Sequence, residues 1–147
     1  MNLQPSEFTR GDYVISTDPS RLNLEWIHGY LTHDSYWARG ISAQVFKKSI
    51  ENSICFGMYD QIEQVGFGRV ISDFATFAYL ADVFVAQKLQ GRGLGKWLVR
   101  CILAYPELQG LRRWMLATRD AHGLYEHFGF KPVGKPGNLM EILKVKG

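Results

Sequence analysis

The run Gln90-Gly91-Arg92-Gly93-Leu94-Gly95 has the composition of an anion-binding loop. Its three glycines leave the backbone N–H groups without side chains that would shield them from a ligand. The run follows an apolar segment, residues 79–85, and precedes residues 94–103, where leucine and isoleucine recur at helical spacing. In such a turn the N–H groups can converge on one anion, and the positive end of the following helix adds to the attraction. The sequence therefore predicts a pyrophosphate site and a nucleotide-bearing cofactor.

Two common phosphate-binding loops do not match this run. A nucleotide-binding P-loop requires the pattern G-x-x-x-x-G-K-[ST], but Gly91 and Gly95 are one residue too close together for it. In addition, Lys96 is followed by Trp97, so no hydroxyl is placed for a metal ion. A dinucleotide-binding loop requires G-x-G-x-x-G and an acidic residue about 20 residues further on. This run reads G-x-G-x-G, and Arg113 stands near that distance.

A third pattern, [Q/R]-x-x-G-x-[G/A], is satisfied by Gln90, Gly93 and Gly95. On these residues the chain resembles the GNAT superfamily of acyl-CoA N-acyltransferases, in which this loop binds the pyrophosphate of coenzyme A. A second pattern of that family, N-x-x-A-x-x-[L/F]-Y-x-x-x-G-F, is matched over residues 118–130 at every fixed position except the first, where Thr118 replaces asparagine. The motif resemblance covers roughly residues 65–133. Considered alone, the loop could instead be a ligand-free turn between a strand and a helix.

The resemblance implies acetyl-CoA, a form of coenzyme A, as the cofactor. In the family, the pantetheine arm pairs with the backbone of the central strand where that strand kinks away from its neighbour, and an N–H there can donate to the thioester oxygen. The alternative for this segment is a plain buried strand. The cofactor-binding residues implied are Phe84, Val85, Gln90, Gly91, Arg92, Gly93, Leu94, Gly95, Lys96, Thr118, Ala121 and Tyr125.

Two residues are candidates for catalysis. The resemblance implies that Tyr125 is the general acid that protonates the departing thiolate, whereas the helix alone would favour a packing role beside Phe128. Asp82 is a carboxylate in an otherwise apolar strand, which suggests a functional site. The resemblance implies that it faces the acceptor amine, because many chains of the family have an acidic residue near this position. The alternative for Asp82 is a buried salt bridge to Arg69 or Arg119. Other carboxylates that could serve the amine are Asp120, which more readily caps the helix that starts at Ala121, and Glu126.

The acceptor is expected to bind a polar and aromatic segment around the end of the first helix, because loops carry specificity on a rigid scaffold. The segment comprises His28, Thr32, His33, Asp34, Ser35, Tyr36 and Trp37. The alternative is a solvated loop whose aromatic side chains pack on the core. His122 and His127 are expected to have no catalytic role. The substrate-binding residues predicted from this segment are His33, Tyr36 and Trp37.

The elements that must position these residues follow from hydrophobic periodicity and turn signals. A first helix is expected at residues 20–31, where the Asp18-Pro19-Ser20 turn marks its start. Further helices are expected at residues 41–52, 94–103 and 121–128. Strands are expected at residues 12–17, 54–59, 64–72, 77–85, 114–118 and 139–145. This order, βααβββαβαβ, is that of the GNAT fold, an α/β (α+β) architecture with a mixed central sheet and helices on both faces.

Composition and charge exclude several classes of protein. The 147 residues suffice for one domain, expected to span residues 1–147. A net charge of +3 without a run of basic residues does not favour nucleic-acid binding. No apolar stretch has the length of a membrane span, and no signal peptide is visible. Cys55 and Cys101 lie in apolar segments and are expected to be buried free thiols, which fits a cytoplasmic protein without a metal site.

The sequence thus predicts an acetyl-CoA-dependent N-acetyltransferase that acts on a primary amine of a small molecule or peptide by direct attack. The alternative is a non-catalytic acyl-CoA-binding sensor or regulatory module, against which Tyr125 argues. The acceptor amine, the strict identity of the acyl group, the general base and the oligomeric state are not fixed by the sequence, and a homodimer is compatible with it.

Overall fold

The computed structural model describes residues 3–145, which form two compact units. The first unit ends at Ala117 and the second begins at Thr118. Among the described residues, no helix is long and apolar enough to span a membrane. The same residues contain no group of three or more histidine, cysteine, aspartate or glutamate side chains that could hold a metal ion.

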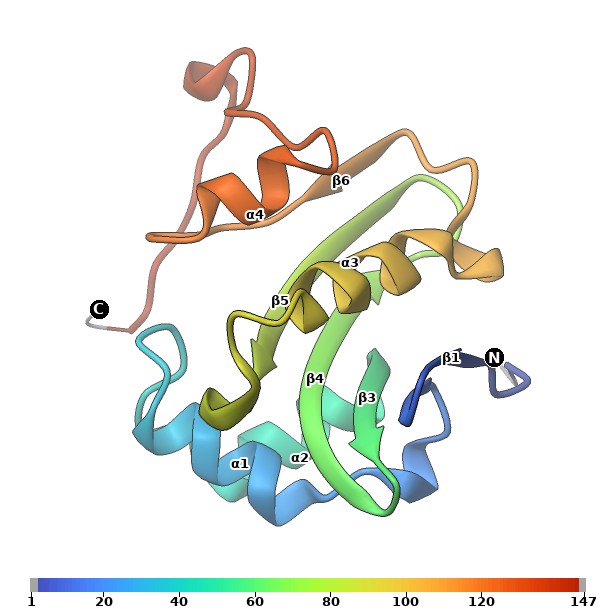
Figure 1. The fold of residues 1–147 in the computed structure, drawn as a ribbon. Helices are drawn as coiled ribbons and strands as arrows, with labels where there is room; N and C mark the ends of the chain where they lie inside the picture. The colour runs from blue at the N-terminus through green and yellow to red at the C-terminus, as the bar shows by residue number, and fades with distance from the viewer. Residues whose placement is uncertain (1–2, 146–147) are drawn as a thin grey trace. The chain divides into compact units, whose positions relative to one another are not determined.

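The first unit is built on a six-stranded sheet whose strands lie side by side in chain order (Figure 1). Strands β1 to β5 pair in antiparallel fashion, and β6 pairs with β5 in parallel. A parallel pair needs a crossover connection, and the helix α3 provides it. The strands are β1 (Glu7–Arg10), β2 (Tyr13–Ser16), β3 (Ile54–Asp60), β4 (Glu63–Ser72), β5 (Phe77–Val85) and β6 (Arg113–Met115).

The first three α-helices begin after a polar side chain or a glycine. Asn23 accepts a hydrogen bond from the backbone N–H of Trp26, and Ser42 accepts one from Val45, so each caps a helix. The α-helices are α1 (Leu24–His33), α2 (Ala43–Glu51), α3 (Leu94–Ala104) and, in the second unit, α4 (His122–Glu126). Short 3₁₀ helices are η1 (Pro19–Arg21), η2 (Gln87–Leu89), η3 (Pro106–Leu108) and η4 (Pro136–Asn138).

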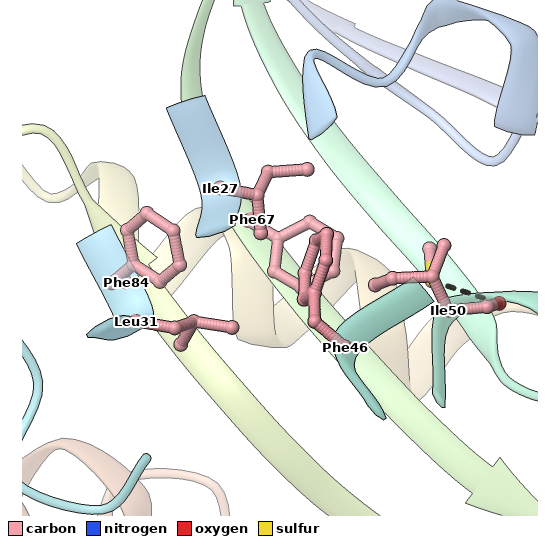
Figure 2. Packing of buried hydrophobic residues seen from close by; sticks show 7 residues of the cluster. Ile27, Leu31, Phe46, Ile50, Phe67 and Phe84 are labelled. Carbon is pink, nitrogen blue, oxygen red and sulfur yellow. Dashed lines mark hydrogen bonds between the residues drawn. The ribbon is translucent and has the colours of Figure 1, made fainter. Parts of the chain in front are cut away.

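One face of the sheet is covered by α1 and α2. Figure 2 shows Ile27 and Leu31 of α1 and Phe46 and Ile50 of α2 packed against Phe67 and Phe84 of the sheet. The apolar residues of each helix recur three or four positions apart, so they share a stripe that faces the sheet. Cys55 belongs to the same cluster.

The opposite face is covered by α3, which crosses β4 and β5 in Figure 1. Because successive residues of a strand point to opposite faces, Gly68 faces α3 while its neighbour Phe67 faces α1 and α2. A Cβ atom at Gly68 would lie 2.8 Å from Cδ1 of Ile102, so glycine makes room for the helix. The ring of Phe56 meets that of Tyr105 edge-on at 5.4 Å on this face.

The predicted fold class is confirmed, including the mixed sheet with helices on both faces. Three details of the predicted order are wrong. An additional strand, β1, pairs with β2 at the start of the chain. The first helix begins at Leu24, because Asp18 caps the short η1 helix instead. No strand forms at residues 139–145, and no described strand pairs with that segment to satisfy its backbone hydrogen bonds.

Candidate functional site

The strand β5 carries a β-bulge that includes Asp82. Between the pairs Phe67–Phe84 and Arg69–Ala81, β5 has two residues where β4 has one. Asp82 is one of the two, and its φ of 55° lies in the left-handed region. A bulge bends a strand and increases its twist, which re-aims the residues that follow.

On the side of β5 that faces β6, the strand pairing ends before the bulge. The parallel pairing with β6 covers only Phe77 to Tyr79, whereas β5 continues to Val85. Among the described residues, no strand pairs with residues 80–85 on that side. The backbone N–H of Ala86 donates to Val65 of β4 at 2.7 Å, so the N–H of the preceding Val85 points the other way. The N–H of Val85 therefore points to the side of β5 on which no described strand is paired.

The glycine-rich loop joins the end of β5 to the N-terminus of α3. Nε2 of Gln90 donates to the backbone oxygen of Val85 at 3.1 Å, which ties the loop to the strand. Gly91 and Gly93 have φ values of 84° and 78°. Residues with a Cβ atom rarely adopt such angles, so the glycines at these two positions follow from the shape of the loop.

The first turn of α3 has backbone donors that lie outside the helical hydrogen-bond ladder. Gly93 is the N-cap and has no side chain that could accept from the N–H groups of the next residues. The first helical hydrogen bond runs from Trp97 to the oxygen of Gly93, at 3.1 Å. The N–H groups of Leu94, Gly95 and Lys96 therefore precede the helical ladder and can meet an anion. The side chain of Leu94 is buried while those of Arg92 and Lys96 are exposed.

Asp82 forms the salt bridge that was the alternative to a catalytic role, and its partner is Arg69. Oδ2 of Asp82 lies 2.8 Å from Nε of Arg69, and the two side chains are only 9% and 14% exposed. The other oxygen, Oδ1, accepts from Nε1 of Trp37 at 2.7 Å. The structure thus brings two of the predicted site residues, Asp82 and Trp37, into direct contact.

Aromatic side chains surround this contact. Trp37 meets Tyr36 edge-on at 5.1 Å and lies 6.3 Å from the ring of Tyr30. Tyr30 stacks on Phe84 at 3.8 Å, and Trp26 lies 5.3 Å from the same ring. Sequence reasoning did not select Trp26 and Tyr30, although their spacing of four residues on a helix places them on one face.

The other polar residues of the predicted acceptor segment hold the chain together locally. Nε2 of His28 lies 2.8 Å from the backbone oxygen of Ile41, and the hydroxyl of Thr32 donates to the same oxygen. Ser35 is buried and donates to the oxygen of Leu31 at 2.7 Å. His33 is the exposed last residue of α1.

The remaining predicted residues, Thr118, Ala121 and Tyr125, belong to the second unit. The hydroxyl of Thr118 accepts from the backbone N–H of Ala121, so Thr118 and not Asp120 supports the start of α4. Tyr125 is buried, and its ring meets Phe130 edge-on at 5.9 Å.

Known proteins are similar to this chain over most of its length. A family model described as an acetyltransferase (GNAT) domain matches residues 51–132. FG08082 of Gibberella zeae, named as a candidate acetyltransferase, is 36% identical over 151 residues, which cover 87% of this chain and 84% of that protein.

Solved structures agree with the sequence relatives. A GNAT-family protein from Xanthomonas campestris pv. campestris superposes with a TM-score of 0.87 at 49% identity, over 89% of this chain and 92% of that one. A Clostridium acetobutylicum protein crystallised with acetyl-CoA has the same fold, with a TM-score of 0.66 at 11% identity over 89% and 94% of the two chains. Since the family model spans more than half of the sequence, the chain belongs to the GNAT family of acetyltransferases.

Proposed function

We propose that this protein transfers the acetyl group of acetyl-CoA to a primary amine of a small molecule or peptide, by direct attack of the amine on the thioester. The observation that carries the proposal is the junction of β5 and α3, where an open strand edge leads into a glycine-rich helix N-terminus. A strand edge offers backbone hydrogen bonds to an extended pantetheine arm, and a helix N-terminus offers N–H groups to a pyrophosphate. Both chemical features of coenzyme A thus meet matching groups of the chain.

The cofactor would supply an acetyl group activated as a thioester. The backbone N–H groups of Leu94, Gly95 and Lys96 would hold its pyrophosphate, and the exposed side chain of Arg92 would add positive charge. The N–H of Val85, which points away from β4, would donate to the thioester oxygen, where negative charge develops during attack.

Asp82 would receive the acceptor amine. Each of its oxygens accepts one hydrogen bond from the protein, and a carboxylate oxygen has a second lone pair with which to accept another. An alkylammonium group is mostly protonated at neutral pH and must lose a proton before it can attack. Asp82 would bind the ammonium and take that proton, directly or through water.

Tyr125 would protonate the leaving group. As the C–N bond forms and the C–S bond breaks, the sulfur acquires negative charge and the phenol O–H of Tyr125 supplies its proton. Support for this role comes from the position of Tyr125 in the second family motif and from the burial of its side chain.

The cofactor assignment is tested with a matched pair of substitutions, Gly93→Asp and Gly93→Asn. Both residues tolerate the left-handed conformation of Gly93 and both can cap the first turn of α3, but only aspartate adds a negative charge. We expect Gly93→Asp to weaken acetyl-CoA binding about tenfold or more relative to Gly93→Asn, by isothermal titration calorimetry. Equal affinities in the two folded variants would contradict the loop assignment.

The transfer itself is tested by thiol release from acetyl-CoA with a panel of primary amines. We expect release that depends on the amine and that is matched by an acetylated product. Tight acetyl-CoA binding without amine-dependent release would instead identify a non-catalytic acyl-CoA-binding module.

A further inference from the structure

We infer that Arg69 is a positioning residue for the acceptor site, because it fixes Asp82 and, through Asp82, the indole of Trp37. That Asp82 and Trp37 bind the acceptor amine rests on the proposed function. The contacts themselves do not, and they can be tested separately.

Arg69 is the centre of a polar chain that joins four parts of the first unit. Its Nε donates to Asp82 on β5, and its Nη1 donates to Oγ of Ser53 at 3.0 Å, just before β3. Ser53 in turn donates to the backbone oxygen of Ser49 in α2 at 2.7 Å. Trp37 completes the chain from the loop between α1 and α2, by its bond to Asp82. We call Ser53, Arg69, Asp82 and Trp37 the polar chain.

The geometry of the guanidinium group suits this task. Arginine is planar and holds its N–H donors in fixed directions, so one side chain can bond two acceptors at a set angle. A lysine at the same place would offer a flexible ammonium group, which can pair with Asp82 but does not fix its orientation through Ser53. Arg69 also lies opposite Ala81, next to the bulge, so its ion pair bridges the bulged segment of β5.

Trp37 is the link between the polar chain and the acceptor segment. Other bonds of the loop of residues 34–42 are local: Ala38 donates to Ser35 within the loop at 3.1 Å, and Gly40 donates to Thr32 of α1 at 3.1 Å. The indole N–H of Trp37 connects this loop to the sheet. The indole is also 42% exposed, so one part of its surface can line a subsite while its N–H is held.

The opposite charges of Asp82 and Arg69 support the positioning role of Arg69. Asp82 and Arg69 neutralise one another, so the pair attracts a distant cation weakly. An acceptor ammonium would therefore gain most of its binding at short range, from a lone pair of Asp82 and from the aromatic faces of Trp37 and Tyr36. Both contributions require that Trp37 and Asp82 keep their relative position, which Arg69 secures.

The test compares Arg69→Met with the control Arg21→Met. Both substitutions remove an arginine from an ion pair, but Arg21 pairs with Glu7 in another part of the unit and belongs to no proposed binding group. The first measurement is the indole N–H resonance of Trp37 in ¹H–¹⁵N spectra, assigned with Trp37→Phe. We expect this resonance to move in Arg69→Met, to move partly in Arg69→Lys and to stay in place in Arg21→Met.

The second measurement is limited trypsin cleavage after Arg39, which is exposed in the loop, relative to cleavage after Lys47, which is exposed in α2. Cleavage of a folded protein follows local opening, so release of the loop should raise this ratio roughly 5- to 30-fold in Arg69→Met and leave it unchanged in the control. A folded Arg69→Met protein with the ratio and the Trp37 resonance of the wild type would overturn the inference. A general rise in cleavage at both sites, with no change in the ratio, would also overturn it.

The third measurement separates positioning from the proposed function. With 2-phenylethylamine as the probe amine, we expect kcat/KM for the amine to fall about fivefold or more in Arg69→Met, because both the binding and the proton transfer proposed for Asp82 depend on its position, while the Kd of acetyl-CoA changes little. If the wild type acetylates no amine, the proposed function fails, and the resonance and the cleavage ratio still decide whether Arg69 positions Trp37.

Discussion

At the residue scale, the local structure explains why an aspartate occurs at position 82 of an otherwise apolar strand. Its backbone is left-handed, a conformation in which aspartate is tolerated better than the β-branched residues around it. Its carboxylate would be costly to bury alone, but Arg69 and Trp37 satisfy both oxygens. The sequence predicted a special role or a salt bridge from the carboxylate. It did not predict the bulge, because a bulge depends on the register of the neighbouring strand.

At the same scale, Tyr125→Phe removes one hydroxyl and keeps the ring that packs against Phe130. If the hydroxyl is the general acid, we expect kcat to fall roughly 10- to 1000-fold. The Kd of acetyl-CoA, measured by calorimetry, should change little because the proposed pyrophosphate donors are elsewhere. A kcat within about twofold of the wild type, with chemistry limiting turnover, would make Tyr125 a packing residue.

The buried thiols give a prediction about pH. Burial raises the pKa of Cys55 to about 12, although the nearby Arg69 opposes the shift. The pKa of Cys101 is raised to about 11, also by burial. Unfolded thiols ionise near pH 8.5, so above this pH the unfolded chain loses protons that the folded chain keeps. The buried thiols should therefore leave the free energy of unfolding unchanged below about pH 8.5 and lower it as the pH rises above that value.

The measurement is urea unfolding of the wild type and of Cys55→Ala at pH 8 and pH 10. Each thiol that stays protonated in the folded state contributes a slope of up to about 1.4 kcal/mol per pH unit. We expect the loss of stability between the two pH values to be smaller in Cys55→Ala. An equal loss in both proteins would show that the Cys55 thiol ionises as readily in the folded chain as in the unfolded one.

At the scale of elements, the packing of α3 on the sheet depends on Gly68. A methyl group there would lie 2.8 Å from Cδ1 of Ile102, so Gly68→Ala forces this side chain to move. We expect Gly68→Ala to lower the free energy of unfolding by roughly 1–3 kcal/mol. Ile102→Val alone removes a buried methyl group and should cost about 0.5–1.5 kcal/mol.

The double variant makes this contact measurable. Ile102→Val removes the atom nearest to the new methyl group, so the two changes together should cost less than the sum of their separate effects. Denaturant unfolding of the four proteins gives the coupling. Additive changes in the free energy of unfolding would mean that the contact with Ile102 is not the cause of the destabilisation by Gly68→Ala.

Elements defined by short-range patterns were predicted well. β5 and α3 have their observed bounds almost as expected, since apolar periodicity and the glycine loop mark them locally. Errors occurred where long-range pairing decides. Residues 139–145 have an apolar pattern, but a strand needs a neighbour, and the sequence does not tell which strand edge is available. In the same way, Asp18 offered a valid cap, but it caps η1.

The candidate site was predicted unevenly for the same reason. The loop from Gln90 to Lys96 was found because its residues are adjacent in the chain. Trp37 was selected from an unusual loop composition. Its bond to Asp82 joins residues far apart in sequence, so only the structure could reveal it. Trp26 and Tyr30 were missed because aromatic residues on a helix are usually core residues.

At the scale of the whole molecule, each compact unit carries its own prediction about acetyl-CoA. The loop and Val85 belong to the first unit, and Tyr125 belongs to the second. If the loop binds acetyl-CoA, binding should slow hydrogen exchange at residues 90–97, and if Tyr125 also serves the cofactor, exchange at residues 121–126 should slow as well. Protection confined to the first unit would contradict the role of Tyr125 at the sulfur.

The divergence of β5 from β6 has a further consequence for the protein when the proposed cofactor is not bound. On this side of residues 80–85, the structure shows no strand partner among the residues it describes. An unpaired edge of an apolar strand is a template on which a strand of another molecule can add, and such additions lead to aggregation. If the proposed cofactor binds along this edge, acetyl-CoA would also protect the protein against aggregation. Concentrated protein without added ligand should become turbid on gentle warming, and added coenzyme A should keep the solution clear.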